Sequence, residues 1–413
     1  MYIRHKLENG VRIVAEEIKY VNSVSIGIWV KVGSRNENNH NNGMSHFIEH
    51  MLFKGTKNRT AKEIAGSIDK IGGQLNAFTA KECTCFYAKV LDSHFDIALD
   101  ILTDMFFNSS FSESEMEKEK GVVLEEIGMY EDSPEDLVHD IFTQSVWKGN
   151  SLGMPILGTE KTLKAIRRQD IIDYMGANYT PENIVVSVVG NFNKEHVLKE
   201  IEKAFSNYKT SKKNEVVTAK PTFTPSYNHK EKNTEQAHLC IGFNGLELGN
   251  EYTYSLLVLN NIFGGAMSSR LFQKIREDKG LAYSVFSYPS SYTDCGILSI
   301  YAGMKPNQLD YVIELIIEEI KDIKENGISE NELYDSKEQI KGSYILGLES
   351  TSGRMNSIGK SELLLNKIYS PKEIIELIDK VTMDDINNVI DLVFNTDEMS
   401  AAVIGPKRST ILG

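Results

Sequence analysis

The chain has 413 residues, of which 41% are hydrophobic and 25% are charged, a balance typical of a soluble globular protein. Its length exceeds what one compact core can accommodate, so two or more domains are expected. The formal net charge of -13 argues against nucleic acid as a partner, because phosphates would be repelled, and mildly favours cationic or neutral partners.

The N-terminal segment "MYIRHKLENGVRIVAEE" is charged throughout and has no apolar core of signal-peptide length, and no later stretch approaches a membrane span. The chain has four cysteines and no C-x-x-C pair. Cys83 and Cys85 alternate along an expected strand and so share one side, which favours buried free thiols over a metal or redox site. If Met1 is the true start, we expect a protein of the reducing cytoplasm with no membrane partner.

Strand patterns frame the first part of the chain. The segment "NSVSIGIWVKVGS" alternates strictly and predicts a half-buried strand, whose aliphatic face is Val24, Ile26, Ile28, Val30 and Val32. A run from Gly72, "GGQLNAFTAKECTCFYAKV", also indicates β structure. Helical patterns dominate to about residue 180, and "IVVSVVG", ending at Gly190, then predicts a buried strand. An α+β domain over residues 1–206 is therefore expected.

Residues 207–236 are polar and lysine-rich and contain Pro221 and Pro225, which predicts a linker. A second domain is expected over residues 237–413.

The second domain repeats patterns of the first. "FSESEMEKEK" resembles "ISENELYDSK", and "RRQDIIDYMGANYTPENIVVSVVG" resembles "VTMDDINNVIDLVFNTDEMSAAVIG". Within the second pair, Asp170 matches Asp385 and Gly190 matches Gly405, both at a separation of 215. Chance similarity between amphipathic helices explains one such match, whereas ordered matches at near-constant spacing favour duplication.

The segment "SHFIEHMLFKG", residues 45–55, carries two histidines and a glutamate within five positions. On a helix, His46, Glu49 and His50 gather opposite an apolar side formed by Met44, Phe47, Ile48, Met51 and Leu52. Packing does not explain the histidines, although a solvent face could carry them by chance. Histidines at i and i+4 can bind one zinc ion, and Glu49 on the same face can reach a metal-bound water.

A third ligand is expected to be a carboxylate, histidine or cysteine. "SESEMEKEKGVVLEEIGMYED" predicts an acidic helix that opens near Ser112. Glu119 and Glu126 are seven residues apart and share a face, while Glu125 points away from it. Most acidic helices are simply solvated, so the helix pattern alone leaves both interpretations open.

"HFIEHMLFKGT", followed 76 residues after His50 by Glu126 of "GVVLEEIGMYED", resembles the inverted-motif zinc peptidases of the pitrilysin and insulinase family. The likeness covers nearly the whole chain and is strongest to the branch of mitochondrial processing peptidase and its bacterial relatives. It implies one zinc ion per chain, held by His46, His50 and Glu126, with Glu49 as general base and Glu119 supporting the site from behind the ligands. It also implies two related α+β halves, each a sheet packed with helices, that form a clamshell.

Two further stretches resemble the family. In "GGQLNAFTAKECTCFYAKV", Asn76, Ala77 and Phe78 would lie along the backbone of an extended substrate, although Asn76 could merely turn the chain. In "RLFQKIREDKGLAYSV", Arg276 and Tyr283 match the arginine and tyrosine that the second half supplies to the active site. Without the resemblance they would be an exposed helix arginine and a packed tyrosine.

The sequence thus predicts a zinc metalloendopeptidase that cleaves extended peptides or presequence-like segments. A homodimer is the family-based expectation, because the single chain carries two of the four halves found in full-length insulinase-type enzymes. Two alternatives remain at this level: a structural or assembly protein that keeps the fold without catalysis, and a zinc-dependent module that binds peptides without cutting them. Substrate identity, cleavage-site preference and the true oligomer do not follow from the sequence.

Overall fold

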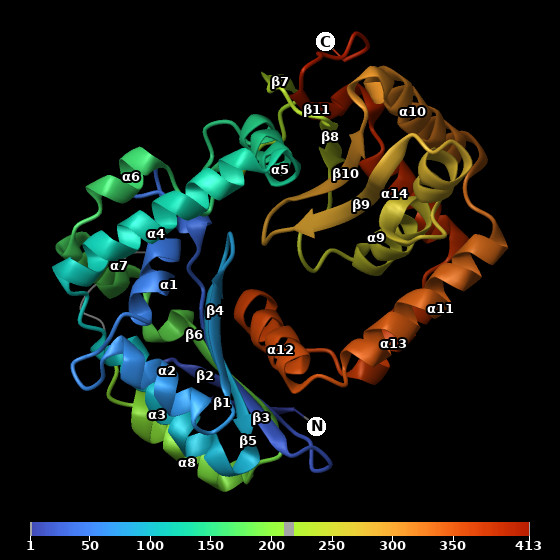
Figure 1. The fold of residues 1–413 in the computed structure, drawn as a ribbon. Coiled ribbons are helices and arrows are strands. Elements are labelled where there is room, and N and C mark those ends of the chain that lie inside the picture. The colour runs from blue at the N-terminus through green and yellow to red at the C-terminus, as the bar shows by residue number, and fades with distance from the viewer. Residues whose placement is uncertain (1, 210–218, 413) are drawn as a thin grey trace. The chain divides into compact units, whose positions relative to one another are not determined.

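The computed structural model describes residues 2–209 and 219–412, and these form two compact units (Figure 1). Unit 1 combines Met1–Gly128 and Met154–Thr218 with the distant segment Gly347–Ile368. Unit 2 combines Met129–Gly153 with Ala219–Leu346 and Tyr369–Gly413. Neither unit is continuous in sequence, because each includes one segment from the other sequence half.

Unit 1 is built on a mixed six-stranded sheet with the order β1-β2-β6-β3-β5-β4. Its strands are β1 Ile3–Lys6, β2 Arg12–Glu17, β3 Ser23–Val30, β4 Gln74–Thr79, β5 Thr84–Leu91 and β6 Ile184–Gly190. Strands β2 and β6 run parallel, and the other neighbours are antiparallel. β4 is the last strand of this order, so one of its edges has no partner strand among the described residues.

Helices cover both faces of this sheet. One face packs on the largest apolar core, to which α1, α2, α3 and α8 contribute, and the other face receives α12 (Figure 1). The helices that begin in unit 1 are α1 Met44–Leu52, α2 Ala61–Asp69, α3 Phe95–Asn108, α4 Glu113–Asp132, α6 Glu160–Ala165, α7 Arg168–Asn178, α8 Lys194–Phe205 and α12 Thr351–Leu365.

The strand expected to be half-buried, β3, is buried on both faces, so that prediction is wrong. Its aliphatic residues face the main core, while Ser25, Gly27 and Trp29 face α12. A side chain at Gly27 would begin 2.5 Å from the sulfur of Met355, and this close approach explains the glycine. The alternating pattern is misleading because α12 fits against small and polar residues of β3.

Unit 2 is built on a five-stranded sheet with the order β7-β11-β8-β10-β9. Its strands are β7 Tyr227–Glu231, β8 Ala237–Asn244, β9 Ala282–Ser291, β10 Gly296–Met304 and β11 Ser400–Gly405. Its helices are α5 Pro134–Val146, α9 Thr253–Asn260, α10 Leu309–Asn326, α11 Glu330–Gly347, α13 Pro371–Asp379 and α14 Met383–Val393. The segment expected to be a linker contains β7, and its residues 210–218 lie outside the described residues.

The two sheets share one topology. The order β2-β6-β3-β5-β4 corresponds to β7-β11-β8-β10-β9, with one parallel pair at the same place in each. In unit 2, α5 packs on β8 and β11, as α12 packs on β3 and β6 in unit 1. Gly242 of β8 lies against Phe142 of α5, as Gly27 lies against Met355. The prediction of an α+β fold with two related halves, each a sheet packed with helices, is confirmed.

The four cysteines are free, and Cys83, Cys85 and Cys240 are buried, in agreement with the expectation of structural thiols. None of the described helices has both the length and the apolar character needed to cross a membrane.

Candidate metal centre

Helix α1 presents the H-x-x-E-H motif, and the residue that precedes it, Gly43, has no side chain to cap the helix. The carboxylate of Glu37, in the preceding loop, takes over that role. It accepts the backbone N–H groups of Gly43 and Ser45, each at 2.7 Å, and the side-chain amide of Asn42 at 3.0 Å. The start of the helix that carries His46 and His50 is therefore held by a side chain outside the helix.

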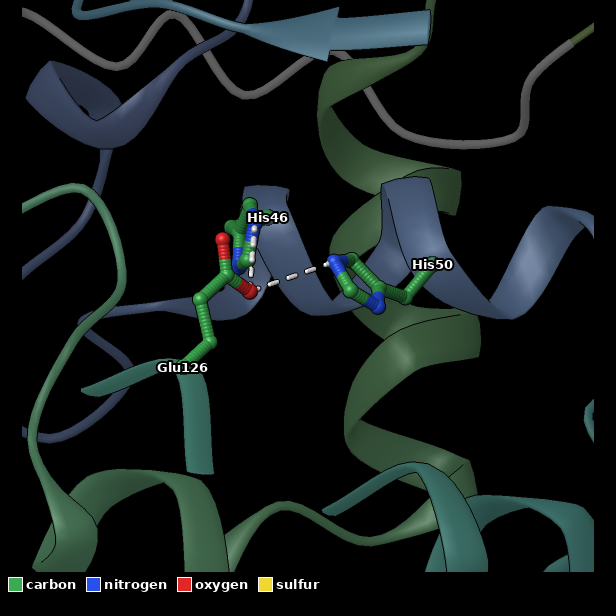
Figure 2. Close-up of side chains that lie close together, drawn as sticks. All are labelled: His46, His50 and Glu126. Atoms are coloured by element: carbon green, nitrogen blue, oxygen red, sulfur yellow. Dashed lines mark ion pairs between the residues drawn. The ribbon is translucent and has the colours of Figure 1, made fainter. Parts of the chain in front are cut away.

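His46 and His50 of α1 face Glu126 of α4 (Figure 2). Oε2 of Glu126 lies 3.7 Å from Nε2 of His46 and 3.6 Å from Nε2 of His50, and the three ligand atoms lie within 4.8 Å of one another. Around a tetrahedral zinc ion with bonds of about 2.0–2.1 Å, neighbouring ligand atoms stand about 3.4 Å apart. The two histidines and the carboxylate therefore fit a zinc site with little adjustment.

The electrostatics of the three ligands suit a metal. Burial, with a smaller effect from His50, lowers the pKa of His46 to about 4, so this imidazole is neutral near pH 7 and can offer a lone pair. The side chain of His46 is 10% exposed, that of His50 22% and that of Glu126 41%. The site is thus open on the Glu126 side, as a catalytic zinc site requires.

Glu119 is buried and lies two helical turns before Glu126 on α4. Its Oε1 is 2.8 Å from Nδ1 of His50, and its Oε2 is 2.7 Å from Nζ of Lys54. The Glu119 carboxylate, which also pairs with Lys54, acts as the acceptor toward His50, so Nδ1 of His50 is the donor and Nε2 faces Glu126 with its lone pair. Glu119 thereby orients one ligand.

Glu49, the expected base, lies on the same side of α1 between the two histidines in sequence. Burial raises the pKa of its carboxyl group above the usual value, while a hydrogen bond from Thr79 and the charge of His50 oppose that shift. Oγ1 of Thr79 donates to Oε2 of Glu49 at 2.5 Å. A partly desolvated carboxylate close to the ligands is chemically suited to proton transfer.

The expected substrate strand, Asn76 to Phe78, lies in β4 at the edge of the sheet. The backbone N–H of Ala77 donates to Oδ1 of Asn76 at 2.9 Å, a bond within β4 rather than across to β5. Phe78 packs edge-on against Trp29, with ring centroids 5.5 Å apart. An edge strand with an outward N–H group can accept an added strand, but the substrate role of these residues stays a prediction.

Arg276 and Tyr283 lie in unit 2. Arg276 belongs to a π-helical turn, Phe272–Asp278, and Tyr283 to the start of β9, where its side chain is 79% exposed. The guanidinium carbon of Arg276 is 5.4 Å from the centroid of the Tyr283 ring, so the two side chains are neighbours. Tyr283 is exposed rather than packed, and the roles of both residues in catalysis stay predictions.

Three residues of the site were not anticipated from the sequence. Lys54 stands four positions after His50, just beyond the end of α1 at Leu52, so the helical period did not assign it to the side of the histidines. Thr79 alternates with Ala77 on one face of β4, which could have suggested contact with the helices. Glu37 carries no comparable pattern, because a loop residue can reach a helix start from many positions.

Comparisons with known proteins point to one family. The family model described as "Insulinase (Peptidase family M16)" matches residues 12–160, and the model described as "Peptidase M16 inactive domain" matches residues 165–340. A Bacillus subtilis protein named "Uncharacterized zinc protease YmxG" is 51% identical over 406 residues and is covered to 98%, as is this chain. "Uncharacterized zinc protease SCO5738" of Streptomyces coelicolor is 40% identical over 416 residues, which cover 98% of this chain and 90% of that protein.

The fold is also found among solved structures. A protease from Helicobacter pylori superposes with a TM-score of 0.92, at 23% sequence identity, over 98% of this chain and 99% of the other. At that identity the likeness concerns the fold. The two family models and the 51% identity to the Bacillus subtilis protein show that this chain belongs to the insulinase family of peptidases, family M16.

Proposed function

We propose that this chain is a zinc-dependent metalloendopeptidase that cleaves extended peptides. The observation that carries the proposal is the convergence of His46, His50 and Glu126 on one point, with Glu49 on the same side of α1. Family membership and the names of the relatives support peptidase chemistry in general.

Each residue has a defined task in this proposal. His46, His50 and Glu126 would hold the zinc ion, which supplies a Lewis acid that makes water more acidic and polarises a carbonyl group. Glu49 would accept the proton of the attacking water and return it to the departing amine. Its partial burial keeps this carboxylate from being fully hydrated, which strengthens it as a base.

The second half would help to stabilise the negative charge that develops on the carbonyl oxygen. Tyr283 offers an exposed hydroxyl group, and Arg276 beside it offers a cation. A donor aimed at such an oxygen stabilises the transition state more than the ground state. We include both residues in the proposal on the strength of the sequence resemblance and of their exposure.

The edge strand β4 supports an extended substrate, since backbone hydrogen bonds are available from any extended sequence. The net charge of -13 favours cationic peptides, such as presequence-like segments of the kind that processing peptidases cut. Equal cleavage rates for a basic and an acidic peptide of matched length at low salt would contradict this charge preference.

A homodimer is part of the same proposal, because each chain carries its own complete set of proposed ligands and base.

The test separates ligand from base. Glu126→Gln is expected to lose most of its zinc on dialysis, because an amide is a poor zinc ligand, and Glu49→Gln is expected to keep zinc while peptide cleavage falls by at least about 10²-fold. Zinc is measured by elemental analysis, and cleavage by mass spectrometry of a mixed peptide library with and without chelator. A wild-type protein that holds zinc and cuts no peptide in the library would contradict the proposal and favour a structural or peptide-binding role.

A further inference from the structure

A hydrogen bond joins the expected base to the expected substrate strand. Thr79, the last residue of β4, donates from Oγ1 to Oε2 of Glu49 at 2.5 Å. Helix α1 packs directly on β4. The bond therefore crosses from the helix that carries the metal ligands to the edge of the sheet.

Thr79 itself is fixed by the sheet. It pairs in register with Thr84 of β5, whose buried hydroxyl donates to the carbonyl of Val32 at 2.8 Å. The next residue, Ala80, donates its N–H to the carbonyl of Cys83 at 2.8 Å. The Thr79 hydroxyl is thus a donor on rigid backbone rather than on a mobile loop.

Successive side chains of β4 point to opposite faces of the sheet. Phe78 points to the α12 side, where it packs on Trp29, and Thr79, the next residue, points to the helix α1 side. The backbone N–H of Ala77 donates to the side chain of Asn76, in the same strand, rather than across to β5. One short strand therefore presents backbone groups to its edge and a hydroxyl group to Glu49.

A carboxylate has two equivalent oxygens and can rotate about its last bond. A donor held on Oε2 stops that rotation and leaves Oε1 as the oxygen that can take a proton. Because Glu49 is partly buried, loss of the donor would leave a charged oxygen without a compensating partner. The carboxylate would then move to regain hydration, and its proton-accepting geometry would be lost.

We propose that Thr79 is the positioning residue of the general base and that it ties the orientation of Glu49 to the strand that holds the peptide. The inference rests on the proposed function, and it adds a residue to which that function assigns no role. The consequence is geometric. Strand β4 would hold both the base, through Thr79, and the substrate backbone, so the base would stand at a fixed distance from the bond to be cut.

The first experiment compares Thr79→Val, which removes the hydroxyl group at nearly constant shape, with Thr79→Ser, which keeps it. Thr79→Val is expected to lower kcat by about 10- to 100-fold with little change in KM, and Thr79→Ser to retain most of the wild-type kcat. Zinc content and affinity of the Val variant should equal those of the wild type, since Thr79 touches no ligand. A Val variant with unchanged kcat, or one whose loss lies in KM alone, overturns the inference.

A second measurement does not depend on catalysis. Thr79→Val and Glu49→Met, which removes both acceptor oxygens, are combined in a double-mutant cycle on the unfolding free energy of the metal-free protein. A coupling energy beyond measurement error shows that the hydroxyl group and the carboxylate interact, and additive effects overturn the inference. Thr79→Ala replaces Thr79→Val in the cycle if the Val variant does not fold.

The two measurements also separate the inference from the proposed function. A wild-type protein that cuts peptides, combined with additive unfolding effects, rejects the role of Thr79 alone. A wild-type protein without peptidase activity rejects the proposed function, and the inference that rests on it falls with it.

Discussion

At the scale of single residues, Glu37 is the side chain whose environment has the clearest solution consequence. It is 5% exposed, and burial raises its pKa from the usual 4.5 to about 7, although hydrogen bonds from Ser45, Gly43 and Asn42 work in the opposite direction. A raised folded-state pKa means that Glu37 contributes most to stability below about pH 4.5 and loses that contribution as pH rises through about 7.

The prediction is a pH-dependent difference between the wild type and Glu37→Gln. The amide does not titrate, so the stability of the wild type relative to the variant should fall by about 3 kcal/mol between pH 4.5 and pH 8. Urea unfolding of both metal-free proteins across this range measures it, and subtracting the variant removes the contribution of every other titrating group. A difference that stays constant with pH would show that Glu37 has an ordinary pKa.

Glu119 gives a second prediction at this scale, because it contacts His50 and is not one of the proposed zinc ligands. Glu119→Gln should weaken zinc binding by about 10- to 100-fold, the usual cost of losing a carboxylate behind a histidine ligand. Competition with a chromophoric chelator gives the affinity. Glu125→Gln, an exposed neighbour on another face of α4, is the matched control and should bind zinc like the wild type. Equal zinc affinities in the two variants would show that a group other than Glu119 orients the ring of His50.

At the scale of elements, β4 carries the prediction about peptide binding. Ala77→Pro removes the N–H that lies along the strand edge, and proline is tolerated on edge strands. KM for an extended peptide is expected to rise about 2- to 10-fold, as for one lost backbone hydrogen bond, with kcat and zinc content little changed. Steady-state kinetics with Ala77→Ser, which keeps the N–H, as control measures it. An unaltered KM in the proline variant would mean that peptides bind elsewhere.

Helix α1 shows how much of the site its own sequence contains. The 3.6-residue period is enough to place His46 and His50 on one side, because both histidines belong to one rigid element. Glu126 comes from another helix, and the acidic pattern of α4 does not distinguish it from a solvated residue, so only the family resemblance singled it out. The contact of Thr79 with Glu49 depends on how α1 packs on β4, which no local pattern encodes.

Strand β3 shows the limit of periodicity for the fold. Its alternation correctly identifies a strand and its apolar face. It does not reveal that Ser25, Gly27 and Trp29 are buried as well, because their cover comes from α12, more than three hundred residues further along the chain. Polar and small residues are stable there since Thr351 and Ser352 bond to Ser25 and since Nε1 of Trp29 donates to Ser187.

At the scale of the whole molecule, the exchange of α5 and α12 between the two sequence halves predicts that neither half folds alone. A chain ending at residue 206 lacks α12 and would expose Trp29, Val185 and Val189, all of which are buried in unit 1. It is expected to bind a hydrophobic dye and to unfold without a cooperative transition. Addition of a peptide of residues 347–368 should restore cooperativity, and the same peptide with Met355→Glu should not, since Met355 is fully buried.

The outcome is read by circular dichroism during urea unfolding. Cooperative unfolding of the 1–206 chain without the peptide would show that the sheet does not need α12. The duplication behind this arrangement was predictable, because ordered matches at a separation of 215 are visible in the sequence. The exchange was not, because the buried face of α12 includes Thr351, Gly359 and Glu362 and so gives no clear apolar pattern that would assign this helix to a sheet.

The position of α12 has a consequence for the order in which the protein takes shape during synthesis. Unit 1 closes only when residues 347–368 have left the ribosome, about 160 residues after its last earlier helix is complete. At about 5–20 residues per second, this interval is about 8–30 s. During this interval the sheet face around Trp29 is exposed to solvent. The nascent chain is therefore prone to aggregation for longer than a protein whose domains are each continuous in sequence.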